Sequence, residues 1–310
     1  MTPTLAAVAL MALAGLQPAT QSPPGSAAVP NERARDPAAA DAAIAERMMA
    51  ELQPVKTPRV TLWAQPDALP ADAAQAFARE LEQGLLAIEA LTGQQVDAAH
   101  YGGSTVHVFV SSRVTISHVY GGYAHPRFDK AYLYLSPQRV KNRAAPYLHE
   151  MTHIVLWNFG SHSLREGFAS YVEGRLAGEG VGYNSGVFGP ESRPEVDAAA
   201  AAALATAVGS TVVPWIGRSG ATDPAITSAG SEDSRAAFYL LARSFVQHLL
   251  DSIDLATFIR LYRAADTEAA YQELTGRSLD EWRASWQRAL ARSAGGVAKG
   301  YQRKLTLPPA

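Results

Sequence analysis

The sequence predicts an α+β fold in which a strand-rich N-terminal half is followed by a helical C-terminal half. Up to about residue 136, short segments alternate between apolar and polar residues, as β-strands do when one face is buried. After that point, apolar residues recur at the three- and four-residue spacing of helices. The chain of 310 residues suffices for one large domain or two smaller ones with a buried core.

The first half is expected to contain three strands and one long helix. This helix, 70–91, has apolar residues at helical spacing and stops at Gly93. A shorter helix at 36–53 has Pro37 at its first position and precedes the strands. The predicted strands are 59–64, 104–112 and 130–136. A Gly-rich loop, YGGYAHP at 120–126, lies before the last of them.

The second half is expected to be mostly helical. Two helices, 144–160 and 163–178, follow each other closely where the pattern changes. Further helices are predicted at 195–208, 236–252, 254–265 and 278–294. The last begins with Ser278 three residues before Glu281, which is the spacing of a capping box. The role of the Gly-, Ser- and Pro-rich stretch 179–234 stays open.

Composition excludes several classes of function. The chain has no cysteine, which rules out a thiol nucleophile, a cysteine-ligated zinc finger and disulfide bonds. Charged residues form 18% of the chain and the formal net charge is -2, so we expect no nucleic-acid partner.

An uncharged apolar run from Leu5 to Leu16 is too short to span a bilayer and fits the core of a secretory signal peptide. We therefore expect export to the periplasm or the extracellular space, with no transmembrane span in the mature chain. Against this interpretation, no basic residue precedes the run and no clean A-x-A site follows it. A disordered Ala-rich leader or a misassigned start is the alternative.

The segment HEMTH at 149–153 carries the strongest chemical signal. On a helix, His149 and His153 lie one turn apart on the same face and can direct two imidazoles at one ion. Zinc favours such nitrogen ligands, and catalytic zinc sites use three protein ligands with one position left open. Glu150 is rotated by about 100° from His149, which suits a general base acting on a metal-activated water. The alternative is two histidines that merely share an amphipathic helix.

Glu166 is the expected third ligand. Twelve residues separate it from His153, which allows one turn and the first turn of an antiparallel helix. Two alternatives stay open. In the segment SLRE, Glu166 also fits the end of a capping box headed by Ser163. His162, in the connecting turn, is a second candidate ligand.

The segment LREGFASYVEG at 164–174 resembles the stretch after H-E-x-x-H in the gluzincin zinc metallopeptidases, the clan of aminopeptidase N and thermolysin. In the aminopeptidases this helix reads W-L-N-E-G-F-A-x-Y, and its glutamate is the third zinc ligand. The matching residues here are Leu164, Glu166, Gly167, Phe168, Ala169 and Tyr171. The resemblance implies that Glu166 binds zinc. Glu173 is then either a supporting group or a solvated carboxylate.

A second segment, FYLLARSFVQHLLD at 238–251, resembles the gluzincin helix whose tyrosine hydrogen-bonds the oxyanion of the reaction. The matching residues are Tyr239, Ala242, Val246 and Leu249. The resemblance implies a catalytic Tyr239, with a core tyrosine as the alternative. His248, on the same helix, is expected at the surface or in packing.

Two departures from the aminopeptidases limit the resemblance. The spacing from His153 to Glu166 is shorter here, closer to compact peptidase-MA-like proteins of bacteria. No G-x-M-E-N motif precedes the zinc helix, so aminopeptidase activity is not expected. The Gly-rich loop and the strand after it resemble the sheet edge on which an extended peptide pairs in this clan.

Together, these features predict a zinc metallopeptidase that acts on a peptide or protein substrate and holds one Zn²⁺ per chain. His149, His153 and Glu166 are the predicted ligands, with Glu150 as the general base. The resemblance covers about residues 58–293. Endo- or exopeptidase action and the oligomeric state stay open. The alternatives are a catalytically inactive peptidase-like binding protein that retains the metal site, and a helical scaffold with fortuitous histidines.

The predicted domain organisation follows from these features. It comprises a signal peptide (1–22), a linker with a short helix (23–57), a metallopeptidase-like domain (58–293) and a tail (294–310). The domain is expected to be strand-rich to residue 160 and helical from residue 161, with the cleft between these two parts.

Overall fold

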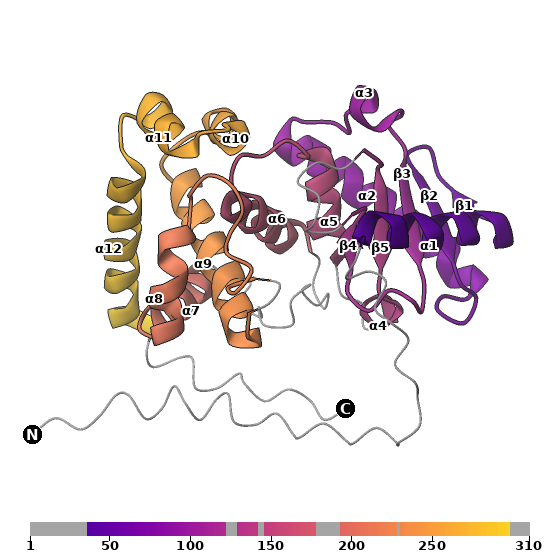
Figure 1. Cartoon of the computed structure of the whole chain (residues 1–310), viewed down its shortest axis with the longest axis horizontal. Helices are drawn as coiled ribbons and strands as arrows, with labels where there is room; N and C mark the ends of the chain where they lie inside the picture. The colour runs from indigo at the N-terminus through magenta and orange to yellow at the C-terminus, as the bar shows by residue number, and fades with distance from the viewer. Residues whose placement is uncertain (1–35, 122–128, 142–145, 178–192, 228–229, 298–310) are drawn as a thin grey trace, which may run out of the picture.

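The computed structural model describes residues 36–121, 129–141, 146–177, 193–227 and 230–297. The predicted signal peptide lies outside these residues, as do most of the Gly-rich loop and parts of the predicted linker, tail and 179–234 stretch. The described chain is an α+β protein with one sheet, and its strands all lie in the N-terminal half (Figure 1). The expectation that strands dominate this half is wrong, because the helix α2 (Ala71–Thr92) alone contains more residues than the five described strands together.

The sheet has the strand order β1-β2-β3-β5-β4. Its central strands are parallel and match the predicted ones: β2 (Val60–Ala64), β3 (Val106–Val110) and β5 (Tyr132–Leu135). Two short strands that were not expected, β1 (Val55–Lys56) and β4 (His118–Val119), pair with β2 and β5 in antiparallel orientation. The strand after the Gly-rich loop is therefore not the edge strand. β4, which precedes the loop, occupies that edge.

Helices cover both faces of the sheet. The helix α2, predicted at 70–91, packs with α5 (Pro146–Val155) on one face (Figure 1). The opposite face carries a row of stacked rings from neighbouring strands, formed by Trp63, Phe109 and Tyr134, with centroids 5.2 and 5.3 Å apart. Such a row of large rings needs a cover, because exposing it would cost hydrophobic free energy.

The cover is α1 (Pro37–Glu51), although its residues fall in the predicted linker 23–57. Ala45 and Met48 of α1 lie on the ring row. Asp41 is fully buried, and its carboxylate accepts hydrogen bonds from His118 Nε2 and from the backbone N–H of Gly121, each at 2.9 Å. The packed structure therefore begins at α1, upstream of residue 58.

The second half is helical, and its main helices lie near their predicted positions. They are α5, α6 (His162–Leu176), α9 (Glu232–Leu250), α10 (Leu255–Arg263) and α12 (Leu279–Val297). The capping box that begins α12 is confirmed: Glu281 accepts the Ser278 N–H at 2.7 Å, and Ser278 Oγ accepts the Glu281 N–H at 3.3 Å.

Other helices differ from the prediction. The expected helix 195–208 is two helices, α7 (Arg193–Leu204) and α8 (Ala207–Val212), because Thr206 has extended backbone geometry and its side chain accepts the Gly209 N–H. Four short elements were not expected: α3 (Ala98–Tyr101), α4 (Pro137–Lys141), the 3-10 turn η4 (Val213–Trp215) and α11 (Thr267–Thr275).

One continuous core joins the two halves, and it includes Leu85 of α2, Met151 of α5, Phe168 of α6 and Phe245 of α9. In Figure 1, α6 lies between the sheet with its helices and the remaining helices. None of the described helices is by itself long and apolar enough to cross a membrane, and one bent pair, Glu195–Leu204 with Ala207–Trp215, reaches that length and composition only when taken together.

Candidate metal centre

The helix α5 presents His149 and His153 on one side, as the spacing predicts. Their rings lie 4.8 Å apart between centroids and are nearly perpendicular, and both side chains are 2% exposed. The C-terminal end of this helix is held by two tyrosines: Tyr101 donates to Ile154 O at 3.1 Å, and Tyr262 donates at 3.0 Å to the carbonyl of Leu156, the residue after the helix. These bonds satisfy groups that a helix end leaves unpaired, and they fix the helix that carries both histidines.

The helix α6 brings Glu166 to the same point. Its N-cap is Ser161, whose Oγ accepts the Leu164 N–H, so the alternative of a capping box headed by Ser163 is wrong. Ser163 lies inside the helix, and its hydroxyl accepts the Gly217 N–H at 2.7 Å. Glu166 is fully buried and faces α5.

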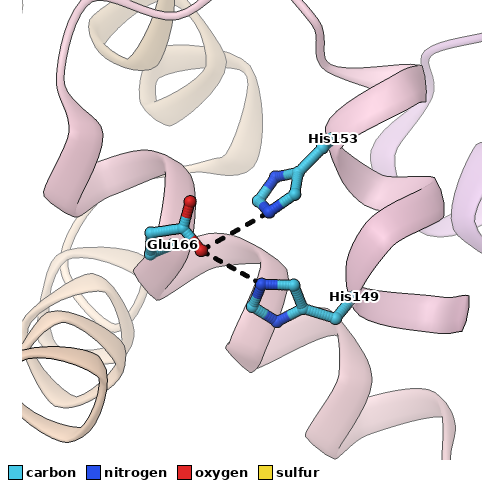
Figure 2. A group of neighbouring side chains, drawn as sticks. All are labelled: His149, His153 and Glu166. Atoms are coloured by element: carbon cyan, nitrogen blue, oxygen red, sulfur yellow. Dashed lines mark hydrogen bonds and ion pairs between the residues drawn. The ribbon is translucent and has the colours of Figure 1, made fainter. Parts of the chain in front are cut away.

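The three side chains converge on one small volume (Figure 2). Glu166 Oε2 lies 3.1 Å from His149 Nε2 and 3.5 Å from His153 Nε2. Zinc bonds of about 2.0–2.1 Å place neighbouring ligand atoms of a tetrahedron about 3.3 Å apart. These two spacings, and three donor atoms that all lie within 4.8 Å of one another, suit a metal ion held by three protein ligands, and the N, N, O donor set is one that zinc accepts.

The second oxygen of Glu166 has a separate set of neighbours. Arg165 Nη1 donates to Glu166 Oε1, and His162 Nε2 lies 3.5 Å from the same oxygen. His162, the other candidate ligand, thus lies on the far side of the carboxylate from the two histidines of α5 and is not one of the three grouped donors. Sequence analysis did not identify Arg165, because consecutive helical residues usually point in different directions.

Glu173 lies next to the group and is buried. Its Oε2 is 3.7 Å from His149 Nδ1, the ring nitrogen that does not face Glu166. A carboxylate at that nitrogen orients a metal-ligating imidazole and favours the tautomer in which Nε2 is free to bind. This position suits a supporting group better than a solvated carboxylate.

Burial and mutual contacts shift the protonation of the group strongly. Burial disfavours charged His149, but its contacts with the carboxylates of Glu166 and Glu173 outweigh this and raise the pKa of His149 to about 10. Burial, together with the nearby Arg165, lowers the pKa of His153 to about 3. Burial also opposes ionisation of Glu166, yet the guanidinium of Arg165 holds the pKa of that carboxyl well below its usual range. A metal ion bound here would displace the proton of His149.

The two predicted catalytic residues adjoin the group. Glu150 is buried on α5, and burial raises the pKa of its carboxyl to about 7. Tyr239 is half-buried on α9, with its ring centroid 6.1 Å from that of His149. His248 packs as expected, with Nε2 2.9 Å from Ser285 Oγ and its ring against Trp282.

No protein-family model matches the chain, and no curated protein matches it.

Proposed function

We propose that the chain is a zinc-dependent hydrolase of peptide bonds, of the gluzincin type that its motifs resemble. The observation that carries the proposal is the approach of Glu166 Oε2 to His149 Nε2 and His153 Nε2, at 3.1 and 3.5 Å. These three residues would hold the ion. When bound, zinc would lower the pKa of a water in its open position and polarise the scissile carbonyl.

The protein residues supply the proton transfer and the charge stabilisation. Glu150 would take the proton of the attacking water and return it to the leaving amine, and a carboxyl with a pKa near neutrality serves both steps. Tyr239 would donate a hydrogen bond from its hydroxyl group to the developing oxyanion, since its ring lies beside that of His149.

A peptide is the proposed substrate because β4, an edge strand, contacts α5, the helix that carries His149 and His153. β4 has a partner in the sheet only on the β5 side among the described strands, and it contacts α5. An extended chain can add to such an edge through main-chain hydrogen bonds. The proposal includes export through the N-terminal apolar run, which places the substrate outside the cytoplasm.

The second candidate is a peptidase-like binding protein that keeps the metal but does not cleave. The presence of Glu150 favours the enzyme, because loss of the general base is the simplest route to an inactive relative.

The test compares the purified full chain with Glu150→Gln on a broad peptide library read by mass spectrometry, with the metal content measured in parallel. We expect about one zinc per chain in both proteins, as three protein ligands predict, and a fall in cleavage of about 10²–10⁴-fold in the variant. Glu273→Gln, the same substitution on the exposed surface of α11, should leave cleavage unchanged. Equal cleavage by wild type and Glu150→Gln would refute the mechanism, and a zinc-loaded wild type without activity would favour the binding protein.

A further inference from the structure

We propose that Arg165 is a positioning residue that restricts Glu166 to a single coordinating oxygen. The inference rests on the proposed metal site and concerns how that site fixes its coordination number. It follows from the way in which the two oxygens of one buried carboxylate are divided between two sets of neighbours.

The division is clear in the distances. Oε2 of Glu166 faces the imidazoles of α5, at 3.1 and 3.5 Å. Oε1 accepts a hydrogen bond from Arg165 Nη1 and has His162 Nε2 at 3.5 Å. A carboxylate can bind a metal through one oxygen or through both. With Oε1 already held by a guanidinium, only Oε2 is available to an ion between the histidines.

Contacts on other sides hold the Arg165 side chain in the position from which it donates to Glu166 Oε1. Its side chain is 4% exposed, its guanidinium lies over the ring of Phe159 at 5.2 Å from the centroid, and its backbone N–H bonds to Ser161 O at 3.0 Å. A charge-assisted hydrogen bond to a carboxylate is among the stronger polar contacts in proteins, and a buried guanidinium deprived of its carboxylate is costly. The contact is therefore persistent.

The motif itself does not provide this contact. In the aminopeptidase pattern W-L-N-E-G-F-A, an asparagine precedes the ligand glutamate, and this chain has Arg165 at that place. An asparagine has neither the reach nor the charge of a guanidinium. The arginine thus gives this chain its own means of keeping the ligand monodentate.

A zinc ion held by Oε2 of Glu166, His149 and His153 would have three protein donors and one position open to water. If Oε1 were released, the carboxylate could supply a second oxygen, and zinc accepts five donors. Substitution of Co²⁺ for zinc would distinguish four donors from five, because the coordination geometry of Co²⁺ determines its visible absorption. Four-coordinate Co²⁺ absorbs visible light several-fold more strongly than five-coordinate Co²⁺.

The experiment loads the full chain with Co²⁺ and compares wild type, Arg165→Gln and Arg175→Gln, the last an exposed arginine on the same helix. We expect intense visible bands in wild type and in Arg175→Gln, and bands several-fold weaker in Arg165→Gln. Identical spectra for wild type and Arg165→Gln would overturn the inference while leaving the metal site intact. A wild type that binds no Co²⁺ or Zn²⁺ would instead overturn the proposed function, and this inference with it.

X-ray absorption on the zinc-loaded wild type gives a second measurement that needs no variant to fold. One carboxylate oxygen at bonding distance supports the role of Arg165. Two oxygens of Glu166 at bonding distance would refute it, whatever the variants do.

Discussion

Gly167, next to the proposed ligand Glu166, lies where α6 crosses α9, and its replacement by alanine offers a sharp test of this packing. A methyl group built there would lie 2.6 Å from the carbonyl carbon of Ala242 and 2.8 Å from Val246 Cγ2. Ordinary contacts of a Cβ atom begin near 3.4 Å. The obstacle is the backbone of α9, which cannot rotate away as a side chain can. The methyl group would lie closer still to the carbonyl oxygen of Ala242, so the two helices would have to separate by more than the roughly 0.8 Å between 2.6 and 3.4 Å.

The magnitude follows from two opposing effects. Overpacking costs about 1–3 kcal/mol, and contact with rigid backbone places Gly167→Ala near the upper end. The higher helix propensity of alanine returns about 1 kcal/mol. We therefore expect a loss of about 2 kcal/mol, or a Tm lowered by about 3–4 °C, because an unfolding entropy of about 2.1 cal/mol/K per residue amounts to about 0.5–0.65 kcal/mol/K for a chain of this size. Zinc affinity should fall as well, because the same movement displaces Glu166 relative to the histidines of α5.

Thermal unfolding followed by circular dichroism and a zinc competition titration would measure both effects. Gly174→Ala is the matched control on the same helix, where the added methyl meets the guanidinium end of the Arg243 side chain instead of backbone. It should cost less, because a side-chain end can move. A Gly167→Ala protein as stable as wild type, or no less stable than Gly174→Ala, would show that the crossing of α6 and α9 is looser than described.

Two further predictions concern α9 and α12. Tyr239→Phe should lower kcat by about 10²–10³-fold if the hydroxyl stabilises an oxyanion, with zinc content and Tm unchanged. Retention of full activity would mean that the tyrosine serves packing alone. At the start of α12, hydrogen bonds from the backbone and side chain of Ser278 hold the pKa of Glu281 below its usual range. A lowered folded-state pKa means that this contribution is present above the unfolded pKa and lost as the pH falls through the folded one. Glu281→Gln should therefore be less stable than wild type at pH 7 and equal to it near pH 3 in urea unfolding, whereas a pH-independent difference would contradict the role of the charge.

The sequence was informative where local chemistry decides the structure. The spacing of His149 and His153 fixes their common face on any helix, and the pair Ser278 and Glu281 marks the start of α12 wherever that helix packs. The central strands are also recognisable from the sequence. Their β-branched and aromatic residues favour strands, and this local preference does not depend on which strand lies next to them in the sheet.

The errors arose where partners distant in sequence decide. By residue type, Ser161 and Ser163 are equally suited to cap α6. Ser161 is the cap, and the hydroxyl of Ser163 instead accepts a hydrogen bond from the distant Gly217 N–H. The helix α1 was predicted as part of a linker. The ring row that it covers comes from three separate strands, so no local pattern in the sequence shows that α1 packs on it. Arg165 gave no signal, since its side chain is buried beside Glu166 only because α6 packs against helices distant in sequence, α9 among them.

The segments that follow α6 supply none of the three proposed metal ligands, yet they help to determine the distance between α5 and α6, the two helices that carry them. The turn between α5 and α6 is held from outside: Gly160 N–H donates to Tyr262 O at 2.8 Å, Gly220 N–H donates to Gly160 O at 2.7 Å, and His162 N–H donates to Gly220 O at 3.0 Å. Three backbone bonds of this kind restrict the turn, each with a net contribution of about 0.5–1.5 kcal/mol. The separation of Glu166 from the histidines is thus set by segments more than fifty residues downstream. The arrangement of the three candidate ligands is therefore a property of the whole fold, and the short motif HEMTH does not by itself build it.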